Sequence, residues 1–169
     1  MRQRIAAGIG AGLVAGLFFA VLMRVLSVSA PDGSYITMIT YAARRIRAGS
    51  PLAGWLAYVA YAVVLGALFG ASFFARRPAG IRTALLGGVW GAGWFVLIGF
   101  GLIPALLGSR PFSAPALRVL GHIGLPLLAG HIVYGLVLGA GFSLILSTFT
   151  KPGKPGRSDR MQSGMRRVA

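Results

Sequence analysis

Four long stretches of this 169-residue chain contain no Asp, Glu, Lys or Arg. They are Ile5 to Met23, Ala48 to Ala75, Thr83 to Ser109 and Val119 to Thr150, with 19, 28, 27 and 32 residues. A helix rises about 1.5 Å per residue, and the hydrocarbon layer of a bilayer is about 30 Å thick. Each stretch can therefore cross a membrane once and is too short to cross it twice. The pattern predicts an all-α integral membrane four-helix bundle.

The composition agrees with lipid as the solvent of this chain. Its mean hydropathy is +0.78, and only 11% of its residues are charged, which leaves too little polar surface for a soluble domain. We expect one transmembrane domain over residues 1–150 and a basic, disordered cytoplasmic tail over residues 151–169. The predicted spans are about 5–23, 52–75, 83–106 and 127–149. The fourth span starts at residue 127 because Pro126 is expected to divide the fourth stretch.

The net charge of +15 is best explained by membrane topology. In a soluble protein such a charge would suggest nucleic acid, but here the basic residues lie at the ends of the spans, and we expect no nucleic acid partner. With the N-terminus inside, eleven of the 17 basic residues are cytoplasmic and six are on the other face. The prediction is a multi-pass protein of a prokaryotic plasma membrane with both termini cytoplasmic. The basic loops and tail would attract anionic lipid headgroups.

The first span also has some features of a signal peptide. Met1-Arg-Gln-Arg4 is basic, and Val28-Ser-Ala30 resembles a cleavage site. The apolar run of 19 residues is longer than the usual 7 to 15, and Arg24 interrupts the approach to the site. We therefore expect an uncleaved span, with cleavage to a three-span protein as the alternative.

The first loop carries the pattern of an interfacial amphipathic helix over residues 34–47. Its start is indicated by Pro31-Asp-Gly-Ser34, and Gly49-Ser-Pro51 would turn the chain back into the bilayer. Apolar side chains recur at helical spacing opposite Arg44 and Arg47; they are Tyr35, Ile39, Ala42 and Ile46.

An internal repeat with an offset of 73 residues relates the second span to the fourth. Ala57-Tyr-Val-Ala-Tyr-Ala-Val-Val-Leu-Gly-Ala67 aligns with Gly130-His-Ile-Val-Tyr-Gly-Leu-Val-Leu-Gly-Ala140. The first and third spans match more weakly at an offset of 75, with Gly12 over Gly87 as one of the coincident pairs. The chain is therefore predicted to be two copies of a helical hairpin. Since each copy has two spans, both would insert the same way round, as a parallel repeat.

Glycines at small-xxx-small spacing occur in every span and predict close helix packing, because a missing side chain lets two backbones approach. These candidate packing residues are Gly8, Gly12, Gly16, Gly66, Gly70, Gly87, Gly91, Gly135 and Gly139.

The residues that usually carry chemistry are scarce. The chain has no Cys and no Glu, and its two carboxylates, Asp32 and Asp159, lie outside the spans. This argues against proton or sodium coupling and against carboxylate-based hydrolysis. His122 and His131 are nine residues apart, on opposite sides of one helix, so they cannot bind one haem iron together. We predict no enzymatic activity, no catalytic residues, no metal site and no cofactor.

His131 is the plainly ionisable group inside a span and the best functional candidate. The repeat makes Tyr58 its counterpart, with Tyr61 and Tyr134 one turn deeper, so these four residues could form a polar pocket in the outer half of the bundle. The alternative is a neutral, structural histidine that is hydrogen-bonded to a tyrosine hydroxyl or a backbone carbonyl.

Two short motifs carry a resemblance to a known group of proteins. Pro51-Leu-Ala-Gly-Trp55 opens the second span, and Gly130-His-Ile-Val-Tyr-Gly-Leu-Val-Leu-Gly139 lies in the fourth. The chain resembles the small four-span bacterial and archaeal membrane proteins that are grouped as domains of unknown function. In those proteins a histidine often follows the Gly-Trp of the second span, where this chain has Tyr58. The resemblance implies a four-helix membrane bundle and no particular activity.

The sequence therefore predicts a non-enzymatic membrane protein. It would act as a helix-packing homo-oligomer or as an accessory subunit that packs against another membrane protein through its glycine-lined faces. The alternative is a small-solute or anion permeation protein, in which the basic outer loop attracts the solute and the polar pocket lines its route.

Overall fold

A computed structural model describes residues 1–25, 27–29, 35–37, 40, 50–72, 80–106, 108 and 110–150, and gives only the backbone for residues 28, 29, 36, 51, 103, 106, 114–123 and 150. Its elements in chain order are α1 (Arg2–Val25), β1 (Ser27–Ser29), β2 (Tyr35–Thr37), α3 (Pro51–Ala71), α4 (Ile81–Val96), the π-helix η2 (Leu97–Leu102), α5 (Ile103–Leu106) and α6 (Ala114–Thr150). Four helical segments are long and apolar enough to cross a membrane: Arg2–Val25, Leu52–Ala71, Ile81–Leu102 and Gly124–Phe149. The predicted set of four apolar helices of membrane length is confirmed.

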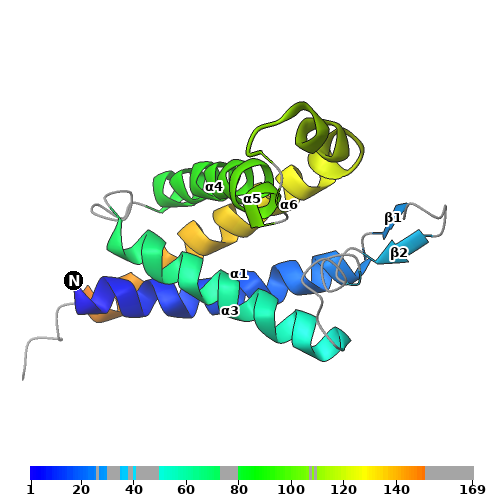
Figure 1. Cartoon of the computed structure of the whole chain (residues 1–169). Helices are drawn as coiled ribbons and strands as arrows, with labels where there is room; N and C mark the ends of the chain where they lie inside the picture. Colours follow the sequence, from blue (N-terminus) through cyan, green and yellow to red (C-terminus); the bar gives the residue numbers. More distant parts are fainter. Residues whose placement is uncertain are drawn as a thin grey trace, which may run out of the picture.

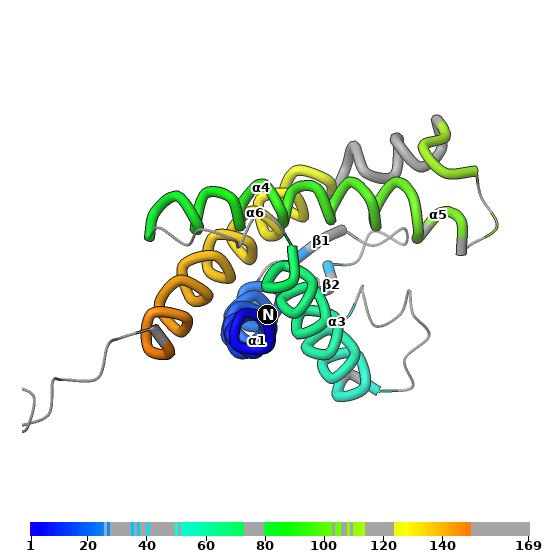
Figure 2. Tube along the Cα trace, turned by 90° about the vertical axis from the view of Figure 1, so that its left-hand side faces the viewer, coloured from blue at the N-terminus to red at the C-terminus, as the bar shows by residue number. Residues whose placement is uncertain are grey.

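The long helices form two antiparallel pairs (Figure 1). Helix α1 packs against α3, and α4 packs against α6. The pairs are joined by an extensive contact between α1 and α6. Figure 2, which looks nearly along α1, places α3 on one side of α1 and α6 on the other. Within the described residues, α3 and α4 form no comparable contact.

The core lies where α1 meets α3 and α6, and it is almost wholly apolar. Small side chains on α1 let α6 and α3 come close, and three phenylalanines fill the remaining space. The rings of Phe69 and Phe142 meet edge to face at 5.5 Å between centroids. The buried side chains with a polar group in the described part of the chain include those of Thr83 and Tyr134. The core members on α1 are Ala7, Ala11, Ala15, Phe19 and Met23.

The third span is not one regular helix. Pro104 has no N–H to donate to the carbonyl of Phe100, and the chain passes through the π-helical segment η2 just before it. The freed Phe100 carbonyl accepts a hydrogen bond from Phe112 N–H at 2.8 Å. Phe112 adopts φ 55°, and its ring stacks on that of Phe100. This bond compensates for the one that proline removes.

A short β-hairpin occupies the start of the predicted interfacial helix. Strand β1 pairs antiparallel with β2, with Val28 opposite Ile36. The prediction of a helix over residues 34–47 is therefore wrong for residues 35–37, where the β-branched Ile36 and Thr37 favour extended backbone. Except for residue 40, the remainder of that predicted helix lies outside the described residues.

Helix α6 continues through Pro126, so the expected interruption at this residue is also wrong. A proline inside a helix removes one backbone hydrogen bond without necessarily ending the helix, because the neighbouring bonds remain. The helix ends at Thr150. The predicted tail over residues 151–169 lies outside the described residues.

Arg4 links the start of α1 to the end of α3. Its Nη2 donates a hydrogen bond of 2.7 Å to the carbonyl of Ser72, the C-cap residue of α3. A cation at a helix C-terminus is favourable because the unpaired carbonyls there carry partial negative charge. At the other end of α3, the Ser50 hydroxyl accepts a hydrogen bond from Ala53 N–H.

Candidate functional site

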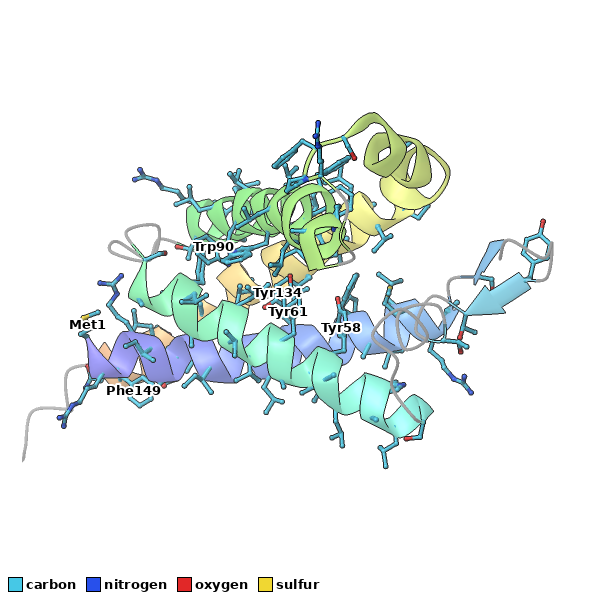
Figure 3. The ribbon with its side chains drawn as sticks, in the orientation of Figure 1. Met1, Tyr58, Tyr61, Trp90, Tyr134 and Phe149 are labelled. Carbon is cyan, nitrogen blue, oxygen red and sulfur yellow. The ribbon has the colours of Figure 1, made fainter. Side chains whose placement is uncertain are left out.

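The predicted polar residues gather around one phenylalanine of α1. We call Phe19, Tyr58, Tyr61, His131 and Tyr134 the aromatic cluster. The centroid of the fully buried Phe19 ring lies 5.4 Å from that of Tyr58, 5.5 Å from that of His131 and 6.3 Å from that of Tyr134. Figure 3 shows the three tyrosines in the region between the lower helix pair, which is α1 with α3, and the segments α4 and α5 above it.

Tyr134 connects the two helix pairs by a hydrogen bond. Its side chain is buried on α6, and its hydroxyl donates to the backbone carbonyl of Ala62 on α3 at 2.8 Å. Tyr61 behaves differently: its hydroxyl is buried and has no hydrogen-bond partner within the described residues. The Tyr58 and Tyr61 rings lie 6.0 Å apart between centroids.

His131 is held by its own helix. Its Nδ1 lies 2.8 Å from the carbonyl of Leu127, and because a carbonyl only accepts, Nδ1 carries the hydrogen of this bond. The imidazole also packs against Phe19 and Phe95, with centroids 5.5 and 5.4 Å away. The sequence suggested that His131 and Tyr58 could face each other, but each packs on Phe19. The bond to a backbone carbonyl matches the structural alternative.

No protein-family model matches this chain, and comparison with curated proteins and with solved structures gives no match either.

The candidate packing glycines all lie at the contacts within the two helix pairs. At α1–α3, a Cβ on Gly12 would lie 2.7 Å from the Ala62 carbonyl oxygen, and one on Gly16 would lie 2.6 Å from Ala62 Cβ. At α4–α6, a Cβ on Gly87 would lie 2.9 Å from Gly139 N. The same holds for the remaining six: Gly8, Gly66, Gly70, Gly91, Gly135 and Gly139. Since real Cβ atoms do not approach backbone so closely, glycine is required at these contacts.

The two interfaces use equivalent positions of the proposed repeat. Adding 75 to a position in α1 and 73 to a position in α3 converts one set of contacts into the other. The two sets are Gly12 against Ala62 and Gly66 in the first pair, and Gly87 against Gly135 and Gly139 in the second.

The contacts between the pairs do not follow the repeat. Helix α1 packs closely on α6, whereas the equivalent helices α4 and α3 do not pack in the same way. At an offset of 75, Ala15 corresponds to the much larger Trp90, and Phe19 corresponds to Trp94. Trp90 lies between α4 and α3, with its ring centroid 5.8 Å from Phe69 and 5.7 Å from Trp94. Its bulk keeps α4 from lying on α3 as α1 lies on α6.

The aromatic cluster offers hydrogen bonding and aromatic contact. Within the described residues, no three His, Cys, Asp or Glu side chains come together as metal ligands. Sequence reasoning identified the two tyrosines and the histidine that surround Phe19, but it did not single out Phe19 itself. An apolar ring in an apolar span carries no signal of its own. The alignment of Phe19 with Trp94 was the available hint.

Proposed function

We propose that this chain is a non-enzymatic integral membrane protein of a prokaryotic plasma membrane that works through helix packing. It acts either as a homo-oligomer or as an accessory subunit of a larger membrane complex. In this proposal the four apolar helices cross the bilayer, both termini are cytoplasmic, and the basic loops and tail contact anionic headgroups.

The sealed interior is the observation that carries this proposal. The largest fully buried side chains include Phe19, Phe69 and Phe142, together with Leu65 and Leu138. A solute that passed through the centre of the bundle would have to displace these side chains from a close-packed core. Permeation requires a polar or wide route, so the described interior favours packing over the permeation alternative.

The organisation as two parallel hairpins is part of the proposal. It is supported by the equivalent glycine contacts in the two helix pairs. Retention of the first span is supported by the burial of α1, whose Ala7, Ala11 and Ala15 are fully buried against other helices. Loss of α1 by cleavage would expose that core.

The surface for a partner has to lie away from the candidate packing glycines, because these residues already contact other helices of the same chain. Opposite its contact with α1, helix α3 offers an exposed face at helical spacing. Four alanines lie on it beside the larger Val64: Ala53, Ala57, Ala60 and Ala71. Small residues let another membrane helix approach closely. This α3 face is our candidate contact surface.

Native mass spectrometry of protein extracted gently from its own membranes tests the proposal. We expect a homo-oligomer or a complex with other membrane subunits. Ala57→Trp should reduce the assembled fraction at least several-fold, whereas Val89→Trp, at an exposed position of α4, should leave it unchanged. A bare monomer in native membranes, with no co-purifying subunit, would contradict a packing role.

A further inference from the structure

The aromatic cluster contains two equivalent tyrosines with unequal hydrogen bonding. Tyr134 on α6 donates to the carbonyl of Ala62 on α3. The repeat converts this bond into one from Tyr61 to the carbonyl of Gly135, but the Tyr61 hydroxyl has no partner within the described residues. A buried hydroxyl without a partner is unfavourable, because it has lost its hydrogen bonds to water. The Tyr61 hydroxyl is therefore a buried hydrogen-bond donor that has no acceptor within the described residues.

The same region of α3 lacks a covering helix. On α6, the face that carries Tyr134 is covered by α1, whereas α4 does not cover the equivalent face of α3. On that face Tyr58 and Tyr61 are half-buried, and Val64 and Leu68 are exposed. The half-buried Trp90 marks the α4 side of this edge. We call this region the α3–α4 edge.

Two further polar groups of the cluster are available for hydrogen bonding. The Nε2 atom of His131 accepts no hydrogen bond within the described residues, because the only bond of that ring is made by Nδ1. The Tyr58 hydroxyl likewise makes none there. The cluster thus combines phenol hydroxyls with an imidazole acceptor between aromatic rings.

The position and charge of these groups define the ligand class. Tyr61 is near the middle of α3, about 15 Å from either end of the helix, so in a membrane it is reached through hydrocarbon. The cluster contains no carboxylate and no Lys or Arg, so a charged ligand would be buried without a counter-charge. The ligand should be neutral, lipid-soluble and flat, with an oxygen acceptor.

We propose that the α3–α4 edge binds a neutral, lipid-soluble ring compound of the quinone type, with a ring carbonyl as the acceptor for Tyr61. The ring lies against Trp90 and the tyrosines. Because the Tyr61 hydroxyl is buried, its side chain turns toward the edge on binding, and this movement breaks no hydrogen bond. The proposal concerns binding alone.

Tryptophan fluorescence of the full chain in lipid nanodiscs tests the proposal, with 2-methyl-1,4-naphthoquinone as the probe. We expect saturable quenching. Tyr61→Phe should weaken the apparent Kd about tenfold, the effect of one lost hydrogen bond. Tyr35→Phe, at the exposed tyrosine of β2, is the matched control and should leave the Kd unchanged.

Two results would overturn the proposal. Quenching that rises linearly with quinone and is equal in all variants would mean partition of the probe into lipid. Saturable quenching with the same Kd in Tyr61→Phe and wild-type protein would show that Tyr61 does not take part in binding the quinone. The native mass spectrum of each variant reports assembly separately, so failure of ligand binding is distinguishable from failure of the packing role.

Discussion

The proposed repeat aligns Tyr61 with Tyr134, yet the hydroxyls of these two residues differ in their hydrogen bonds. The Tyr134 hydroxyl bonds a carbonyl on the other pair and so connects α6 to α3. The Tyr61 hydroxyl makes no bond within the described residues. The contribution of a hydroxyl inside the bundle therefore depends on whether an acceptor lies within reach.

Tyr134→Phe should destabilise the folded protein by about 1 kcal/mol, because it removes the hydrogen bond to Ala62 and leaves that carbonyl with one contact fewer. Tyr61→Phe is the matched control and should change the free energy of unfolding by about zero or stabilise slightly. Unfolding by dodecyl sulfate in mixed micelles, followed by tryptophan fluorescence, measures both. An equal decrease in the free energy of unfolding for the two variants would contradict a stabilising role of the Tyr134 hydrogen bond.

The site residues were partly predictable from the sequence. A histidine and three tyrosines stand out in apolar spans, and the repeat suggested that they gather at similar depth. The role of Phe19 as their common neighbour could not be predicted, because it depends on how α1 packs on α6. That packing is set by the small side chains of Ala11 and Ala15, which look like ordinary span residues.

At the scale of the helices, the glycine ladders predict tight contacts, and the structure places each ladder against another backbone. The irregular segments were harder to predict. The π-helix η2 depends on the hydrogen bond that Pro104 cannot make and on Phe112, a residue beyond the end of the span, which satisfies the freed carbonyl. The β-hairpin depends on pairing between strands β1 and β2, which the helical spacing around residues 35–46 conceals.

Two glycines of α4 allow the effect of helix packing on stability to be measured apart from the effect of helix propensity. Gly87→Ala should destabilise by about 1–3 kcal/mol, because its methyl group would collide with the backbone of Gly135 on α6. Gly93→Ala has nothing within 4 Å of the added carbon, and alanine is the better helix former, so it should be neutral or stabilising by up to about 1 kcal/mol. Thermal unfolding in detergent measures both. A Gly87→Ala variant as stable as Gly93→Ala would contradict the close α4–α6 contact.

At the scale of the whole molecule, the structure is two similar helix pairs joined on one side only. The contact between α1 and α6 closes one side, and the bulk of Trp90 keeps α3 and α4 from closing the other in the same way. The sequence predicted the pairs through the repeat, but not this difference. It arises from single positions that the proposed repeat aligns, such as Ala15 and Trp90, whose side chains differ greatly in size.

The central claim is that four helices cross the bilayer with both termini on the cytoplasmic face. The chain has no native cysteine, so single cysteines can be placed freely. In intact cells, a membrane-impermeant maleimide should label Ser27→Cys and Arg110→Cys, both exposed at the far end of the bundle. Gln3→Cys and Ser163→Cys should react only after permeabilisation. Labelling of Gln3→Cys and Ser163→Cys from opposite faces would contradict an even number of crossings and, with it, the four-span account.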